Sequence, residues 1–144
     1  MGYTHYWNNT KFTTEQWSEL AKDAAKLFKE CKQNGILLAA EYDRTKTPPH
    51  IGLESIVFNG VGDEGHETFV LEKTPDPNGF VFCKTLRKDY DTAVVALLII
   101  ATTHNPEFRW SSDGKSKDHA DGLTIVNKIN GLNNTTGCVE SISE

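Results

Sequence analysis

The sequence predicts a single α+β domain, in which a mainly antiparallel sheet of about five or six strands packs with three helices. The chain has 144 residues, which is the length of one domain with a core of its own. Three segments have the apolar spacing of helices. Short segments rich in aromatic and β-branched residues, separated by turns with Gly and Pro, lie between them.

The N-terminal segment predicts a strand followed by a helix. Residues 2–7 are rich in aromatic and β-branched types, and a strand there places the odd-numbered side chains on one face. Thr13 and Gln16 match a capping box, and Asn34 with Gly35 is expected to end the helix. The apolar positions of this helix recur at steps of three and four residues: Trp17, Leu20, Ala21, Ala24, Leu27, Phe28 and Cys31.

Further short strands are expected at residues 36–42, 55–59, 66–72, 79–85 and 108–111. The middle three of these are spaced as an antiparallel meander. Residues 43–52 contain Thr47-Pro48-Pro49-His50 and are expected to form a loop, because proline cannot donate to a strand ladder.

Residues 90–104 predict a second helix that is apolar on almost every side, since every residue from 93 to 101 is apolar. Such a helix must be covered on most sides. We expect the sheet on one side and a neighbouring subunit on the other, so this helix, together with the length of the tail, is the reason to expect a homo-oligomer.

The C-terminal segment predicts a third helix and a tail. Ser116 is expected to cap a helix whose Leu123, Val126 and Ile129 face inward despite Gly122. In the tail at 132–144, residues 138–142 are expected to add an edge strand or to dock on a partner subunit.

Composition excludes several classes of protein. The net charge of −5 and the pI near 5.5 argue against a surface that follows a nucleic-acid backbone. The longest apolar run is too short to cross a bilayer. Three scattered cysteines without zinc-type spacing favour buried thiols in a reducing compartment. We therefore expect a cytoplasmic protein, with neither a membrane nor a nucleic-acid polymer as partner and with no cofactor.

The first candidate site is a basic turn, Phe82-Cys83-Lys84-Thr85-Leu86-Arg87-Lys88, between a strand and the apolar helix. Together with the unpaired N–H groups of the helix N-terminus, Lys84, Thr85 and Arg87 are expected to hold phosphate. A solvated turn without a ligand is the alternative.

The second candidate site combines Asn59-Gly60 with Gly65-His66-Glu67-Thr68. Its glycines let a ligand approach the backbone, so Asn59, His66 and Thr68 are expected to contact a ribose or a base edge. Neighbours on a strand face opposite ways, and for Glu67 we expect a structural hydrogen bond to a turn.

The third candidate site follows the last strand, at Ser111-Ser112-Asp113-Gly114. Ser112 and Asp113 are expected to bind ribose hydroxyls, and Tyr6, Trp7 or Trp110 to stack on a base. The alternative places both tryptophans in the core.

Catalytic and metal-binding interpretations stay open as alternatives. His66 could act as a general base with Asp113 or Glu67. Cys83 could be a nucleophile if neighbouring cations lower its pKa, although a strand cysteine is more often buried and inert. The five histidines lack ligand spacing. We expect no catalytic residue and no metal.

Four segments carry a resemblance to a known family: Met1-Gly2-Tyr3-Thr4-His5-Tyr6-Trp7, His66-Glu67-Thr68-Phe69, Phe82-Cys83-Lys84-Thr85 with Arg87 and Tyr90-Asp91, and Ser111-Ser112-Asp113-Gly114. In these the chain resembles a family of small bacteriophage and prophage proteins of unassigned role. The resemblance implies a phage setting and no particular chemistry.

These observations favour a non-catalytic binder of a phosphorylated, nucleotide-like small molecule. In a phage setting, such a binder would sequester a host immune signal. One alternative is an enzyme that hydrolyses or modifies such a nucleotide. The other is an inhibitor that docks on a host defence protein.

Overall fold

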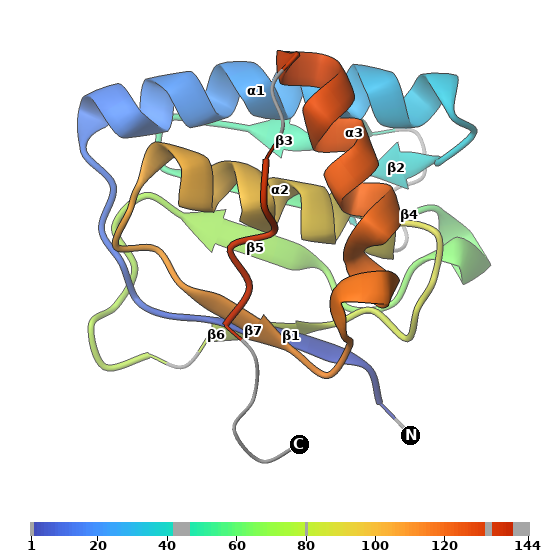
Figure 1. Cartoon of the computed structure of the whole chain (residues 1–144). Coiled ribbons are helices and arrows are strands. Elements are labelled where there is room, and N and C mark those ends of the chain that lie inside the picture. The colour runs from blue at the N-terminus through green and yellow to red at the C-terminus, as the bar shows by residue number, and fades with distance from the viewer. Residues whose placement is uncertain (1, 42–46, 80, 132–133, 140–144) are drawn as a thin grey trace.

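The computed structural model describes residues 2–41, 47–79, 81–131 and 134–139, and in them helices cover one face of a layer of strands (Figure 1). The helices are α1 (Thr14–Gln33), α2 (Asp91–His104) and α3 (Ala120–Asn130). The strands are β1 (Thr4–Trp7), β2 (Leu38–Ala39), β3 (His50–Ile51), β4 (Ser55–Gly60), β5 (Phe69–Glu72), β6 (Val81–Lys84) and β7 (Trp110–Ser112). The predicted α+β class is confirmed, with seven short strands in the described residues.

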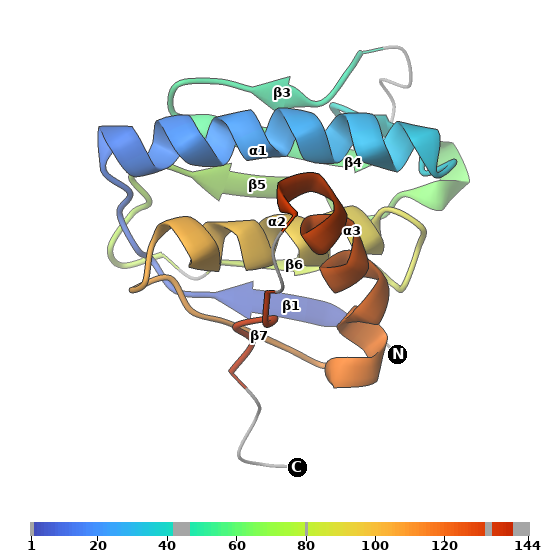
Figure 2. The ribbon, with the colours of Figure 1, turned by 45° about the horizontal axis from the view of Figure 1, so that its top comes forward.

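The strands form two antiparallel sheets. One has the order β6-β1-β7, and in the other β4 pairs with β5, β3 and β2. The sheets meet where the Glu67 N–H donates to the Lys84 carbonyl at 3.2 Å, and Figure 2 shows β4, β5, β6, β1 and β7 in succession behind the helices. Only the first hairpin of the expected meander has a ladder, because β6 pairs with β1.

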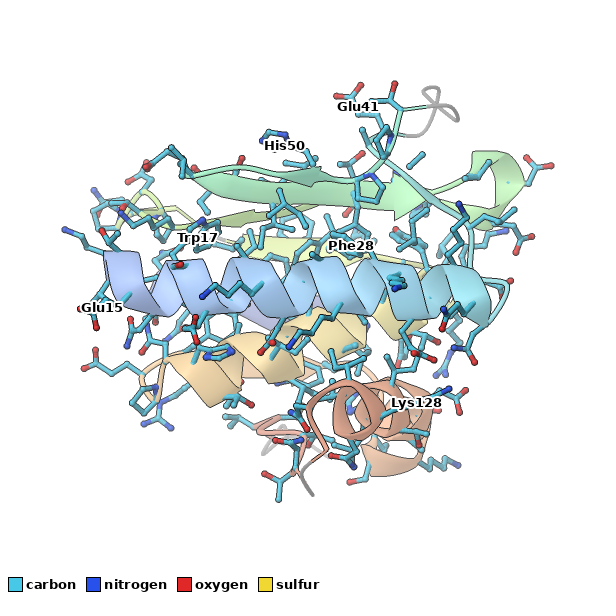
Figure 3. The ribbon with its side chains drawn as sticks, turned by 90° about the horizontal axis from the view of Figure 1, so that it is seen from above. Glu15, Trp17, Phe28, Glu41, His50 and Lys128 are labelled. Carbon is cyan, nitrogen blue, oxygen red and sulfur yellow. The ribbon has the colours of Figure 1, made fainter. Side chains whose placement is uncertain are left out.

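Helix α1 forms as its sequence pattern predicts. Gln16 N–H donates to the Thr13 hydroxyl at 3.1 Å, and Thr13 N–H donates to the Gln16 side chain at 2.9 Å, which completes the capping box. Figure 3 shows Trp17 and Phe28 on the side of α1 that faces the strands. The buried positions are Trp17, Leu20, Ala24, Leu27 and Cys31.

Helix α2 is the centre of the core, and residues 93–101 are all buried. Helices α1 and α3 pack on it within the same chain. A Cβ on Gly122 would lie 2.6 Å from the Val95 side chain, so the absence of a side chain at Gly122 lets α3 approach α2 closely. The apolar face of α2 therefore needs no second subunit, and the expectation of a homo-oligomer loses one of its two reasons.

Two strand predictions differ from the structure. The strand expected at 36–42 is reduced to β2, and its last residue lies outside the described part of the chain. Strand β3 lies in the segment expected to be a loop. It forms directly after Pro48-Pro49, where the N–H of Gly52 donates to the Ser55 carbonyl at 2.8 Å and closes a turn onto β4.

The C-terminal predictions are confirmed in part. Ser116 does not cap α3, because residues 116–119 form a 3₁₀ turn before it. Val126 is buried, and Leu123 and Ile129 pack partly buried against the core. The Val139 N–H donates to the Trp110 carbonyl at 2.7 Å, so the tail reaches the edge of β7. Residues 132–133 and 140–144 lie outside the described ranges, and no helix described here has the length and apolarity to cross a bilayer.

Candidate functional site

One end of the three-stranded sheet brings together the N-terminus, the basic turn and the segment after β7. Strand β1 lies in the middle, with His5 opposite Cys83 on β6 and Ser112 on β7. Past the ladder, the Thr85 N–H donates to the Tyr3 carbonyl at 3.0 Å and the Asp113 N–H donates to the Thr4 carbonyl at 2.9 Å. The segments after β6 and β7 therefore flank Tyr3 and Thr4.

Below this end lies a buried polar cluster, which consists of Tyr3, His5, Thr85, Asp91, Ser112 and His119. Asp91 Oδ1 lies 2.6 Å from His5 Nε2 and accepts a 2.5 Å hydrogen bond from the Thr85 hydroxyl. Because Asp91 is the first residue of α2, its carboxylate also lies at the positive end of the helix dipole. These contacts fix the start of α2 to β1.

His119 and Ser112 form the other half of the buried polar cluster. His119 Nε2 lies 3.2 Å from the Ser112 hydroxyl, which also accepts a 2.9 Å hydrogen bond from the Gly114 N–H. Burial, followed by the nearby His5, lowers the pKa of His119. The centroids of the two imidazole rings are 5.9 Å apart, close enough for a charge on His5 to disfavour a second charge on His119.

Two buried polar atoms of the cluster have no hydrogen-bond partner in the described residues: the Tyr3 hydroxyl and His5 Nδ1. Burial raises the pKa of Tyr3, and the side chain of Ser112, which the Tyr3 hydroxyl approaches, opposes this rise. The Tyr3 hydroxyl lies so close to Gly114 that a Cβ there would be 1.9 Å away. A buried polar atom without a partner costs about 1–3 kcal/mol, and such atoms point to function.

Tyr3 also forms part of the Arg87 hollow, which is lined by Gly2, Tyr3, Leu86, Arg87 and Asp113 and has a volume of about 450 Å³. The Arg87 guanidinium lies over the Tyr3 ring, 3.9 Å from its centroid, and pairs with Asp118 at 3.1 Å. The Lys115 N–H and Arg87 lower the pKa of Asp118. The cation is thus held in one place by a ring and a carboxylate.

The backbone before α2 is strained at the hollow. Leu86 and Arg87 have φ of 53° and 58°, and in the described residues they are the non-glycine residues with positive φ. Each such residue costs of the order of 1 kcal/mol or more. This conformation places Arg87 between Tyr3 and Asp118, and an observed outlier of this kind supports a functional interpretation.

Asp113 also lines the hollow and is exposed. Its Oδ2 accepts from the Thr4 N–H at 3.0 Å, and its Oδ1 lies 3.4 Å from the Tyr6 hydroxyl. A carboxylate has about four acceptor positions. Asp113 is therefore held in place and retains capacity for ligand hydroxyls.

The structure brings six predicted site residues to this end of the sheet: Tyr6, Lys84, Thr85, Arg87, Ser112 and Asp113. Arg87 and Asp113 line the hollow, whereas Thr85 and Ser112 are buried and support it from inside. Lys84 is exposed beside Thr4 on the outer face of the sheet. The Thr85 hydroxyl donates to Asp91, which differs from its expected role on phosphate.

The helix N-terminus differs from the expected anion site. The N–H of Asp91 donates to the Lys88 carbonyl at 2.8 Å, and the N–H of Thr92 donates to the Asp89 carbonyl at 3.3 Å. Both N–H groups already donate to carbonyl groups of the turn, so they are not available to an anion. The Asp91 carboxylate, which would repel an anion, lies at the same end of the helix. The candidate site for an anion is therefore Arg87.

Asn59, His66 and Thr68 form a separate feature, which we call the Asn59 turn. Asn59 Nδ2 donates to the His66 carbonyl at 3.0 Å and to the Thr68 hydroxyl at 3.1 Å. Asn59 Oδ1 accepts from the N–H groups of Gly60 at 2.7 Å and His66 at 3.1 Å. The side chain of Asn59 thus closes the turn between β4 and β5, and the His66 side chain is exposed.

The two tryptophans of the predicted site are in the core. Trp7 is 7% exposed and packs on Phe69, with ring centroids 5.1 Å apart. Trp110 is 1% exposed, and its Nε1 donates to the Thr136 carbonyl at 3.0 Å. The structure therefore favours the alternative that both tryptophans belong to the core. Of the three residues predicted to stack on a base, Tyr6 remains at the surface.

The environments of Cys83 and Glu67 indicate structural roles for both residues. Burial raises the pKa of the Cys83 thiol to about 12, so the neighbouring cations do not activate it. Glu67 Oε1 accepts from the Lys84 N–H at 2.7 Å, and the Glu67 carbonyl accepts from the Tyr90 hydroxyl at 2.6 Å. The expected structural hydrogen bond of Glu67 is therefore present.

The described residues contain no group of three or more His, Cys, Asp or Glu side chains that could hold a metal ion. His50 lies beside β3, across the molecule from Lys128 on α3 (Figure 3), whereas His5 and His119 are buried. The metal-binding alternative thus gains no support from the part of the chain that is described.

Sequence reasoning missed four members of the site: Tyr3, His5, Asp91 and His119. A signal was present for two of them. His5 is a polar residue between Tyr3 and Trp7 on one strand face, and Asp91 is an acidic residue at the start of an otherwise apolar helix. Nothing in the local pattern indicated His119.

The chain was compared with known proteins, and no protein-family model, no curated protein and no solved structure matches it.

Proposed function

We propose that the protein binds a phosphorylated, nucleotide-like small molecule in the Arg87 hollow and releases it unchanged. The observation that carries the proposal is the placement of Arg87. A strained backbone, the Tyr3 ring and Asp118 hold its guanidinium at the edge of the hollow. Leu86 and Arg87 are the central residues of a turn that the Lys88 N–H and the Thr85 carbonyl close at 3.1 Å, and their positive φ values, as in a type I′ turn, place Arg87 over Tyr3.

The groups around the hollow match the parts of such a ligand. The Arg87 side chain is 58% exposed, and a guanidinium has five donors, so it can bind phosphate while it is paired with Asp118. Asp113 can accept hydrogen bonds from ribose hydroxyls. Tyr3 lines the hollow, and its hydroxyl is buried against Gly114 without a hydrogen-bond partner in the described residues, so a ligand oxygen that enters beside Tyr3 would satisfy it.

Binding without turnover is favoured over catalysis by the state of the candidate catalytic groups. His5 is fully buried and its Nε2 is bonded to Asp91. The Cys83 thiol is buried, and its raised pKa keeps it protonated. His66, the general base of the enzyme alternative, belongs to the Asn59 turn through its backbone.

The biological role we propose for such a binder is sequestration of a nucleotide immune signal of the host, in the phage setting that the resemblance implies. Sequestration needs affinity and release of intact ligand, and it needs no catalytic group. This role therefore requires only what the hollow offers: a fixed cation, a carboxylate and an unpartnered hydroxyl.

The test is a depletion experiment. The protein is incubated with a panel of linear and cyclic nucleotides and ADP-ribose derivatives and then filtered. The flow-through is chromatographed, and the retained protein is heat-denatured. We expect depletion of at least one nucleotide and its release intact. A new product would support the enzyme alternative, and an untouched panel would contradict the proposal and favour a host protein partner.

Arg87→Ala is the matched variant for this experiment, and Lys29→Ala, which removes an exposed cation on α1, is its control. We expect Arg87→Ala to abolish depletion, because a charge-assisted hydrogen bond to phosphate is lost. Equal depletion by Arg87→Ala and Lys29→Ala would contradict the placement of the site.

A further inference from the structure

The outer face of the three-stranded sheet, which points away from the helices, carries two aromatic side chains in register. Tyr6 on β1 lies opposite Phe82 on β6 and Ser111 on β7. Side chains alternate along a strand, so the neighbouring His5 and Cys83 point to the core, where both are fully buried. Phe82 is 41% exposed and Tyr6 is half-buried. We call this pair the aromatic face.

The aromatic face is continuous with the Arg87 hollow. The Tyr6 hydroxyl lies 3.4 Å from Asp113 Oδ1, and Asp113 lines the hollow. The ring of Tyr6 therefore extends along the outer face toward the hollow. The next pair in the register is Thr4 with Lys84. Thr4 is only 4% exposed, and Lys84 is an exposed cation on the same face as Phe82.

We propose that the aromatic face binds the base of the nucleotide whose phosphate lies at Arg87, with Asp113 between the two subsites. This inference rests on the proposed function. It assigns the stacking role to Tyr6 and Phe82, and it narrows the ligand class from phosphorylated, nucleotide-like molecules to nucleotides whose aromatic base is bound by the protein. A flat face with polar neighbours suits a base, because every base has an apolar ring surface and polar edges.

A second hollow supports a planar ligand at this position. It has a volume of about 330 Å³, and Tyr6, Arg109, Ser111 and Val139 are among the residues that line it. It extends the surface around Tyr6 on the side of β7. Arg109 is exposed there, and a guanidinium can bond the oxygen and nitrogen acceptors of a base edge.

The test compares two probes, adenosine 5′-monophosphate and ribose 5-phosphate, by isothermal titration calorimetry. The variants are Tyr6→Leu and Phe82→Leu, which keep apolar bulk and remove a ring. We expect each variant to weaken binding of the monophosphate by about 5- to 100-fold, the usual range for the loss of one base-stacking side chain. We expect ribose 5-phosphate binding to be unchanged, and Arg87→Ala to weaken both probes.

Leu53→Ala is the control, because Leu53 is 86% exposed on the turn between β3 and β4. Thermal unfolding of each variant establishes that it is folded. If both leucine variants bind the monophosphate as the wild type does, the inference is wrong while the proposed function stands. If the two probes bind equally well to the wild-type protein, the base has no subsite and the inference is also wrong. If neither probe binds, this inference is wrong, and the proposed function then stands or falls with the depletion of the nucleotide panel.

Discussion

The Asn59 turn and the buried polar cluster both place polar side chains in the interior, but they satisfy them differently. Asn59 is fully buried and makes four hydrogen bonds, two donated by its amide and two accepted. In the buried polar cluster, Asp91 and Ser112 are bonded, whereas the Tyr3 hydroxyl and His5 Nδ1 have no partner in the described residues.

The difference separates a structural network from a candidate binding site. A fully satisfied buried amide stabilises the turn that it closes. A cluster with unpartnered buried atoms costs stability, and a ligand that bonded them would recover that cost. Sequence reasoning assigned residues of both regions to one site, and the hydrogen-bond partners distinguish them.

The largest expected effect comes from the satisfied network. Asn59→Ala removes four hydrogen bonds and leaves the N–H of His66 and the buried N–H of Gly60 without the amide. We expect it to lower the free energy of unfolding by about 3 kcal/mol, measured by urea denaturation. Binding of adenosine monophosphate by the folded variant should be unchanged. Weakened binding would show that the two regions are one site.

Two glycine substitutions sharpen the same comparison. Gly114→Ala places a Cβ 1.9 Å from the Tyr3 hydroxyl, whereas Gly65→Ala places one 2.6 Å from Asn59 Oδ1. Each should destabilise the fold by about 2 kcal/mol, since the neighbours must move. Only Gly114→Ala should also weaken binding of the monophosphate, because it displaces Tyr3. Calorimetric titration checks this. A loss of affinity in Gly65→Ala alone would mean that the Asn59 turn, and not the region around Tyr3, is the binding site.

The pH dependence of stability provides a smaller effect. The pKa of His119 is lowered in the folded protein by burial and by His5, so the unfolded chain takes up the proton first. The stabilisation is present above about pH 6.5, the unfolded value, and is lost as the pH falls toward the folded value.

His119→Gln should therefore flatten the fall in unfolding free energy as the pH is lowered from about 6.5, measured by urea denaturation at several pH values. His66→Gln is the control, since that side chain is exposed. The wild-type slope should persist in the control. An unchanged slope in His119→Gln would mean that other groups cause the loss.

The fold was predictable where the pattern is local. The capping box and the apolar spacing of α1, and the uniform apolarity of α2, are properties of short segments. The basic turn and the segment after β7 were also recognised, which identified Arg87, Ser112 and Asp113. Strand β3 was missed because it follows two prolines and has only two residues.

The rest of the site depends on long-range pairing. His5 and Asp91 are 86 positions apart, and Tyr6 and Asp113 are 107 positions apart. Such contacts follow from the register of β1 between β6 and β7, and a shift of one residue would reverse every side chain. Spacing along the chain therefore could not separate the Asn59 turn from the Arg87 hollow.

The central claim is that the Tyr3 hydroxyl is left unpartnered for a ligand, and Tyr3→Phe tests it most directly. Without ligand, we expect the free energy of unfolding to stay the same or to rise by up to about 1 kcal/mol, because an unsatisfied buried hydroxyl is removed. The affinity for adenosine monophosphate should fall about 3- to 10-fold with the lost hydrogen bond. A destabilised variant with unchanged affinity would contradict the account.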